Sequence, residues 1–70
     1  MDNIIAQLRA ENGLSQAALA ERVGVSRQTI ISIERGRFDP SLPLAFHLAR
    51  TFNRSIEDLF TLNEPSDGER

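Results

Sequence analysis

The sequence has no cysteine, no lysine and no long hydrophobic stretch. Without cysteine, neither a disulfide framework nor a zinc–thiolate site is available to stabilise the fold. A membrane-spanning helix needs roughly 20 consecutive apolar residues, and no segment approaches that length. Residues 1–20 also lack the pattern of a secretory signal. These absences predict a cytoplasmic protein without a membrane segment.

The sequence also lacks the residue arrangements that are typical of enzymes. It has no nucleophile beside a base, no carboxylate pair, no phosphate-binding glycine loop and no cluster of metal ligands. The one histidine, His47, has neither cysteine nor clustered carboxylates near it, so we expect it to face solvent. We therefore predict a protein that is not an enzyme and that uses no cofactor or metal.

A chain of 70 residues forms one domain at most. Such a chain buries about 60% of its unfolded surface, so a second copy often adds to its stability. A hydrophobic content of 40% and a charged content of 26% are ordinary for a globular domain. We expect the domain to occupy residues 1–62, and the polar, acidic residues 63–70 to form a disordered tail.

The charges are unevenly distributed along this chain, whose net charge is −2. Residues 22–37 contain four arginines and one glutamate, whereas residues 56–70 contain five acidic residues and one arginine. A net acidic protein can therefore still present a positive face. All eight basic residues are arginine, the side chain whose planar fork fits phosphate or guanine.

Capping and turn residues divide the chain into five short helices, and no segment clearly predicts a strand. Serine, aspartate and proline mark the helix starts, whereas glycine and asparagine mark several of the ends. The helices are expected from Asp2 to Asn12, from Ser15 to Val23, from Ser26 to Gly36, over 42–52 with Ser41 as its cap, and from Ser55 to about Phe60, with Ser55 and Asp58 as a capping box.

Apolar spacing predicts which side chains face inward. Within each expected helix, apolar residues recur three or four positions apart, as expected for one face of a helix. The predicted inward residues are Ile5, Leu8, Leu19, Val23, Ile30, Ile33, Leu44, Leu48 and Phe52. Gly24 supplies the positive φ of a tight corner between the second and third helices, and Val25 fills that corner. Two helices joined in this way form a helix-turn-helix.

Several segments resemble the Cro/phage-repressor-type (Xre) helix-turn-helix family. In order, these segments are "LSQ" at 14–16, "LAERVGVS" at 19–26, "RQTI" at 27–30, "IERG" at 33–36, "PSL" at 40–42 and "SIEDLF" at 55–60. The resemblance extends from about Ile4 to Phe60 and implies an all-α, compact five-helix bundle of the lambda-repressor-like type. In that family the third helix lies in the DNA major groove.

The resemblance implies roles for individual residues. Arg27, Gln28 and Ser32 take the base-reading positions, with Thr29 beside them or serving the helix cap. The spacing agrees with these roles, because residues 28 and 32 share a face opposite the inward Ile30 and Ile33. Gln16, Arg35, Arg37 and Ser41 are the candidates for phosphate contacts, which position the domain without specifying sequence. Arg22 is expected to be an exposed charge on the second helix.

Two further sets of residues are expected to have structural roles. The family often pairs an arginine of the first helix with the glutamate of "IE-x-G", so Arg9 and Glu34 are expected to form a partly buried salt bridge. Apolar residues near the last two helices are expected to form a homodimer interface, namely Phe46, Ile56, Phe60 and Leu62, while Leu59 is expected in the core. Whether residues 60–64, "FTLNE", add a strand to that interface stays open.

Together these features predict a sequence-specific DNA-binding transcriptional regulator. We expect a repressor that binds a near-palindromic operator as a homodimer, through the helix at about 26–35 in the major groove. Two alternatives remain open. The first is an antitoxin that regulates its own operon and neutralises a toxin protein. The second is a protein–protein adaptor that has kept the fold without DNA binding.

Overall fold

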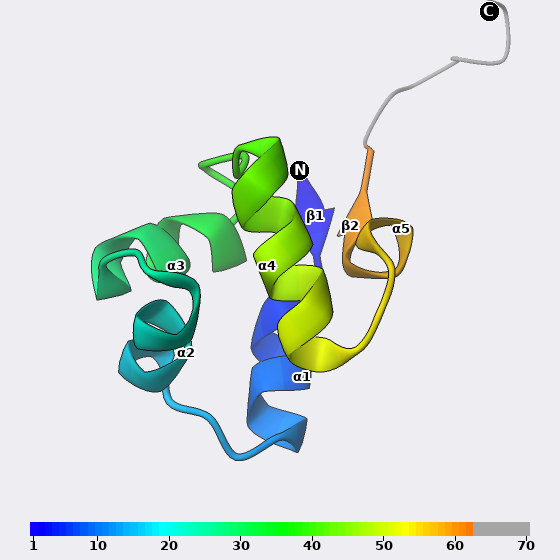
Figure 1. The fold of residues 1–70 in the computed structure, drawn as a ribbon. Helices are drawn as coiled ribbons and strands as arrows, with labels where there is room; N and C mark the ends of the chain where they lie inside the picture. Colours follow the sequence, from blue (N-terminus) through cyan, green and yellow to red (C-terminus); the bar gives the residue numbers. More distant parts are fainter. Residues whose placement is uncertain (63–70) are drawn as a thin grey trace, which may run out of the picture.

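The computed structural model describes residues 1–62. Its elements are β1 (Asp2–Asn3), α1 (Ile5–Glu11), α2 (Gln16–Val23), α3 (Arg27–Glu34), α4 (Leu42–Phe52), α5 (Ile56–Leu59) and β2 (Phe60–Thr61). Figure 1 shows α4 through the middle of the molecule, with α2 and α3 on one side and α5 and the two strands on the other. The five expected helices are confirmed. The tail expected at 63–70 lies outside the described residues.

Serine side chains begin four of the helices described. The hydroxyls of Ser15, Ser26, Ser41 and Ser55 accept hydrogen bonds from the backbone N–H three residues later, at 3.0 to 3.3 Å. Each bond satisfies an N–H group that the first turn of a helix leaves without a partner. The carboxylate of Asp58 also accepts from the Ser55 N–H and completes the predicted capping box. All four predicted caps are confirmed.

The start of the chain differs from the prediction. Asp2 does not cap a helix, because Asp2–Asn3 forms β1, which pairs antiparallel with β2. Helix α1 begins only at Ile5, whose N–H donates to Oδ1 of Asn3 at 3.1 Å. No segment clearly predicted a strand, and the strand left open at 60–64 is present as Phe60–Thr61, whose partner is β1 of the same chain. Helix α5 ends at Leu59, in agreement with the expected end near Phe60, which begins β2.

The core lies where α4 meets the other helices. Its buried side chains are Ile5, Leu8, Leu19, Ala20, Val23, Ile30, Ile33, Leu44, Ala45, Leu48, Ala49, Phe52 and Leu59. This set contains every side chain that the apolar spacing placed inward, and also Leu59, which was expected in the core. Within residues 1–62 no charged or polar residue is fully buried. The fold is therefore held mainly by burial of apolar surface.

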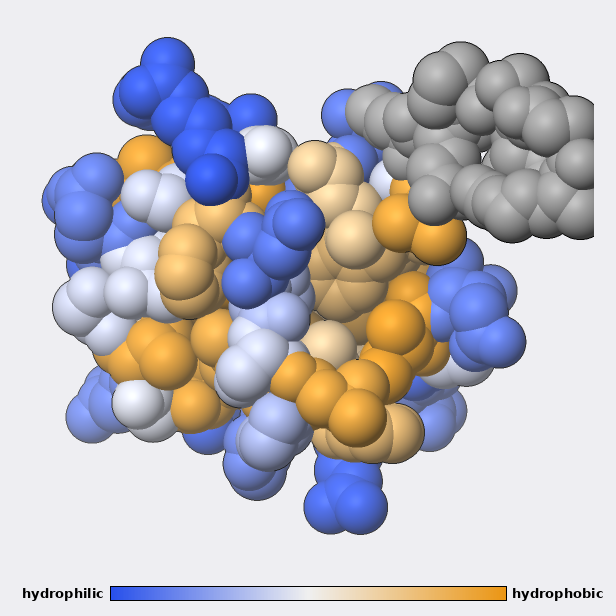
Figure 2. Space-filling view, turned by 90° about the horizontal axis from the view of Figure 1, so that it is seen from above, coloured by the Kyte–Doolittle hydropathy of each residue, from blue (hydrophilic) through white to orange (hydrophobic). Residues whose placement is uncertain are grey.

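Several large apolar side chains remain at the surface. Phe38, Leu42, Phe46 and Leu62 are between 47% and 67% exposed. Figure 2, seen from above relative to Figure 1, shows hydrophobic residues reaching the surface in several places among hydrophilic ones. None of the helices within residues 1–62 has the length and apolar character that crossing a membrane requires.

Candidate nucleic-acid interface

A glycine corner sets the angle between α2 and α3. Gly24 ends α2 with φ +79°, a left-handed conformation that side chains other than glycine rarely adopt. The N–H groups of Gly24 and Val25 both donate to the carbonyl of Ala20, at 2.9 and 3.0 Å. Val25 packs against the core, as predicted. The corner therefore fixes where α3 starts relative to the rest of the bundle.

One face of α3 is buried and the opposite face is open. Ile30 and Ile33 are 0% and 1% exposed, whereas Arg27 and Gln28 lie at the surface and Ser32 is half-buried. Packing on the inner face holds the helix, so the polar side chains on the outer face are presented to solvent. The sequence predicted this division between the two faces.

Thr29 lies beside the helix cap. Its N–H donates to Oγ of Ser26 at 3.1 Å, and its own Oγ1 lies 3.0 Å from the same oxygen. The side chain is half-buried. Thr29 was expected either to read bases or to serve the helix cap. Its contact with Ser26 belongs to the cap.

The C-terminal end of α3 turns back sharply and carries two arginines. The N–H of Gly36 donates to the carbonyl of Ile33 at 2.9 Å, and the N–H of Arg37 donates to the carbonyl of Ser32 at 3.0 Å. This is the Schellman pattern, with Gly36 in the left-handed region at φ +74°. Arg35 and Arg37 flank this glycine, and both are exposed.

A network of side chains joins α1, α2 and α3. Nε of Arg9 lies 2.7 Å from Oε2 of Glu34, so the expected ion pair is present. Nη1 of Arg9 also donates to the carbonyl of Leu14, and Nε2 of Gln16 donates to Oε1 of Glu34 at 3.0 Å. The carboxylate is largely enclosed, with a side-chain exposure of 8%. The amide nitrogen of Gln16, expected at a phosphate, thus already has an intramolecular partner.

The exposed arginines around α3 have no carboxylate partner among residues 1–62. The ion pairs in that range are Arg9 with Glu34 and the Met1 nitrogen with Asp39. The guanidinium groups of Arg27, Arg35 and Arg37 therefore remain available to an anionic ligand. The hydroxyl of Ser41, another phosphate candidate, accepts from the Leu44 N–H at 3.3 Å as the cap of α4.

The residues expected at a dimer interface differ in exposure. Phe46 and Leu62 are 50% and 67% exposed, whereas Ile56 and Phe60 are half-buried against the core. Two grooves lie beside these residues, with volumes of about 460 and 310 Å³. Ile56 lines both grooves, Phe46 lines the larger and Phe60 lines the smaller.

Three residues that the sequence did not single out contact the grooves or the end of α3. Arg50 and Glu57 line the larger groove, and Asn3 contacts the end of α3. Arg50 and Glu57 are exposed charges on short helices, and nothing in their spacing distinguishes them from ordinary surface residues. His47 is exposed, as expected, and residues 1–62 contain no group of three potential metal ligands.

Comparison with known proteins places this geometry in a family. A family model described as helix-turn-helix matches residues 5–59. An uncharacterized HTH-type transcriptional regulator of Methanothermobacter thermautotrophicus is 55% identical over 65 residues, covering 91% of this chain and 94% of the relative. YgzD of Bacillus subtilis, also named an uncharacterized HTH-type transcriptional regulator, is 47% identical over 64 residues, covering 91% of this chain and 97% of the relative.

Solved structures agree with the family match. The restriction-modification controller protein C.AhdI from Aeromonas hydrophila superposes with a TM-score of 0.72 at 34% identity, over 80% of this chain and 85% of that one. A SinR protein/SinI protein complex gives a TM-score of 0.72 at 32% identity, over 91% of this chain and 61% of that one. These similarities confirm the expected lambda-repressor-like fold. The chain belongs to the Cro/phage-repressor-type (Xre) helix-turn-helix family, and it is a transcriptional regulator with a DNA-binding fold.

Proposed function

We propose that this protein is a sequence-specific repressor that binds a near-palindromic operator as a homodimer, with α3 in the major groove. The observation that carries the proposal is the outer face of α3. Arg27 and Gln28 are exposed there, on a helix whose inner face is fixed by Ile30 and Ile33. A rigid helix with polar side chains directed outward is the element that reads base edges in this fold.

The two exposed side chains suit two different bases. The guanidinium of Arg27 can donate two parallel hydrogen bonds to O6 and N7 of guanine. The amide of Gln28 can donate to N7 and accept from the N6 amino group of adenine. Each good pair discriminates against the wrong base by about 1–3 kcal/mol. Ser32, one turn further along the same face, is proposed as a third contact.

The phosphate contacts are proposed after the C-terminal end of the reading helix and at the starts of α2 and α4. Arg35 and Arg37 follow α3 and have no carboxylate partner in residues 1–62. Gln16 stands at the start of α2, where backbone N–H groups also favour an anion. Ser41 is a further candidate, although its hydroxyl serves as a helix cap. Phosphate contacts fix register and make binding sensitive to salt.

A homodimer follows from the size of the domain. A single module of this kind buries too little surface for tight specific binding, and two copies related by a two-fold axis place their reading helices one DNA turn apart. Phe46, Ile56, Phe60 and Leu62 are the proposed interface residues. A repressor of this form acts most simply by occluding the promoter from polymerase.

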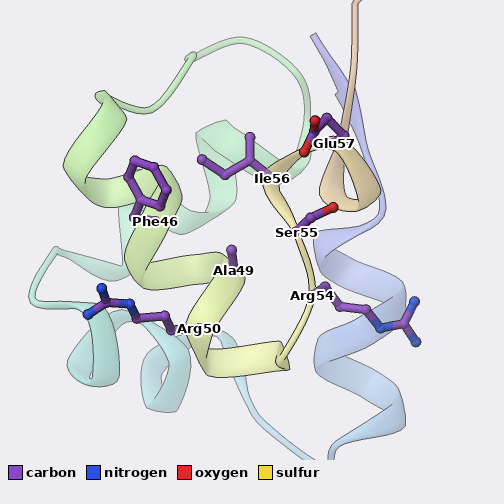
Figure 3. Close-up of a pocket in the computed structure, with 7 residues that line it drawn as sticks. All are labelled: Phe46, Ala49, Arg50, Arg54, Ser55, Ile56 and Glu57. Carbon is purple, nitrogen blue, oxygen red and sulfur yellow. The ribbon is translucent and has the colours of Figure 1, made fainter.

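The larger groove carries charges that suit a second copy of the same chain. Figure 3 shows Ala49 and Ile56 near the middle of the view, Phe46 at the left, Arg50 at the lower left and Glu57 at the upper right. In a two-fold symmetric contact, a residue on one side of the axis meets a residue from the other side. An axis that passes between Arg50 and Glu57 pairs each arginine with the glutamate of the other copy.

The experiment that tests the proposed function is selection of bound sites from random duplex DNA. We expect a two-fold symmetric consensus whose half-sites are about 10–10.5 base pairs apart, centre to centre. Affinity should fall steeply as salt is raised. If no duplex is retained at low salt, the repressor proposal is wrong and the adaptor alternative gains support. Tight co-purification with a small toxin, together with DNA binding, is the outcome that favours the antitoxin alternative.

A further inference from the structure

The side chain of Asn3 joins the ends of two helices. Its Nδ2 donates to the carbonyl of Ile33, in the last turn of α3, at 2.8 Å. Its Oδ1 accepts from the N–H of Ile5, the first residue of α1, at 3.1 Å. The Ile5 N–H is a first-turn donor that the ladder of helical hydrogen bonds leaves without a partner. The carbonyl of Ile33 also accepts from the N–H of Gly36 at 2.9 Å, so Asn3 adds a second bond to the turn that closes α3. One amide therefore caps the C-terminal end of α3 and the N-terminal end of α1 together.

The backbone of the same residue belongs to the two-stranded sheet. Asn3 stands opposite Phe60 in the β1–β2 pair, and the next residue, Ile4, donates its N–H to the carbonyl of Leu59 at 3.0 Å. Asn3 is thus tied to the end of the domain that carries the proposed dimer residue Phe60. The sheet and the last turn of α3 are connected through a single side chain.

The segment before Asn3 also lies against the loop that follows α3. The Met1 nitrogen donates to the carbonyl of Gly36 at 3.3 Å. A Cβ added at Gly36 would lie 3.3 Å from the carbonyl oxygen of Met1, so the two backbones approach closely. Arg35 and Arg37 flank this glycine, and their direction therefore depends on how the last turn of α3 and this loop are held.

We propose that Asn3 is a positioning residue for DNA binding. By fixing the carbonyl of Ile33, it sets the geometry of the turn from which Arg35 and Arg37 reach the phosphates. The base-reading end of α3 is held independently, by the Ser26 cap and the Gly24 corner. Removal of the Asn3 amide therefore weakens phosphate contacts and leaves base preference unchanged. This inference rests on the proposed function, because it assigns a role within the same DNA complex.

A matched control exists in the same chain. Asn12 also donates from Nδ2 to a helix carbonyl at 2.8 Å, in this case the carbonyl of Leu8 at the end of α1. Replacing Asn3 or Asn12 by leucine removes a bond of the same kind and length from a helix carbonyl, but only Asn3→Leu releases the end of α3. Asn3→Leu also removes the bonds of Asn3 to the Ile5 N–H and to the carbonyl of Met1, so Asn12→Leu controls for the bond to the helix carbonyl alone. If Asn3→Leu does not fold, Asn3→Asp keeps the acceptor for the Ile5 N–H and still loses the donor to Ile33.

The first measurement needs no DNA. In the free protein, the amides of Gly36 and Arg37 should exchange with deuterium on the order of tenfold faster in Asn3→Leu, relative to the core amide of Leu48. Asn12→Leu should leave that ratio unchanged. Equal protection of Gly36 and Arg37 in wild type and Asn3→Leu would overturn the inference, because the hydrogen bond would then not hold the turn.

The second measurement uses the duplex recovered by site selection. Asn3→Leu should bind it about three- to tenfold more weakly, as expected for removal of a net hydrogen-bond contribution. The slope of log affinity against log salt should become shallower by about 0.9 for each phosphate that the variant no longer neutralises. The ranking of base substitutions should stay the same, and Asn12→Leu should match wild type in affinity and slope.

The outcomes separate this inference from the proposed function. If wild type binds no duplex, the proposed function fails and the DNA-positioning role fails with it. If wild type binds specifically but Asn3→Leu matches it in affinity and salt slope, only the role of Asn3 is refuted. A changed base ranking in Asn3→Leu would also contradict the inference, since the reading end of α3 would then depend on Asn3.

Discussion

The guanidinium of Arg9 and the carboxylate of Glu34 meet at 2.7 Å although they belong to the first and third helices. Gln16, from the second helix, donates to the other oxygen of the same carboxylate. Glu34, in α3, therefore joins α1 and α2 to the helix that is proposed to read the bases. Because the carboxylate is only 8% exposed, its partners replace most of its hydration.

Removal of Arg9 should destabilise the domain. Arg9→Leu leaves the carboxylate of Glu34 enclosed with Gln16 as its remaining side-chain donor, and the expected cost is about 2–3 kcal/mol of unfolding free energy. Urea denaturation measures this cost. The double variant Arg9→Leu/Glu34→Leu should recover part of it, because no charge is then left behind. A double variant less stable than both single variants would contradict this account.

The arginines at the two ends of α3 should behave differently. Arg27→Ala should cost about 1–3 kcal/mol on the selected operator and relax preference at one base position. Arg37→Ala should weaken binding to all duplexes alike and reduce the salt slope by about 0.9. Titrations of both variants against the operator and a scrambled duplex provide the measurement. If the two variants lose affinity equally on both duplexes, the proposed division of roles is wrong.

Alanine at two left-handed glycines should have unequal effects. Gly24→Ala meets no atom within 4 Å, so its cost is the backbone strain alone, about 1 kcal/mol or slightly more. Gly36→Ala has similar strain and also places Cβ 3.3 Å from the carbonyl oxygen of Met1. In thermal unfolding, the melting temperature of Gly36→Ala should therefore be lower than that of Gly24→Ala. The reverse order would show that residue 1 yields to the new methyl group.

The proposed dimer contact can be tested by exchanging its charges. Arg50→Glu and Glu57→Arg should each weaken self-association by on the order of tenfold, because like charges then face each other twice in a symmetric pair. The double variant should restore association. Sedimentation velocity without DNA measures the monomer–dimer equilibrium of each variant.

Arg22→Glu is the matched control for the charge exchange. Arg22 is exposed in the last turn of α2, as Arg50 is in the last turn of α4. Both substitutions place a negative charge near the C-terminal end of a helix, so their effects on helix stability should be similar. Self-association that is unaffected by Arg50→Glu and Glu57→Arg would place the dimer contact elsewhere.

Local signals predicted most of the fold. Each serine cap and the Gly24 corner depend on contacts within a few positions of the chain. The inward apolar residues pack across helices, but their spacing along each helix is local and can be read from the sequence. The β1–β2 pair joins Asn3 with Phe60, and no local sequence pattern predicts a strand partner so distant in the sequence. The amide of Asn3 likewise reaches the carbonyl of Ile33, a backbone group without any residue-specific signal.

The candidate site was predictable to a different extent. Arg27 and Gln28 could be assigned to the outer face of α3 because Ile30 and Ile33 define the inner one. The Arg9–Glu34 pair was expected from family resemblance and not from spacing, since the two residues belong to different helices. The engagement of Gln16 by Glu34 was missed because it depends on how α1, α2 and α3 meet.

The route of residues 1–3 has a practical consequence for handling the protein. The Met1 nitrogen lies 3.6 Å from Asp39 and touches the loop that carries Arg37. A purification tag fused ahead of Met1 would emerge beside that loop and crowd the surface offered to a duplex. The affinity of such a fusion for the duplex should be lower than that of the same protein after the tag is cleaved, and titration before and after cleavage measures the difference.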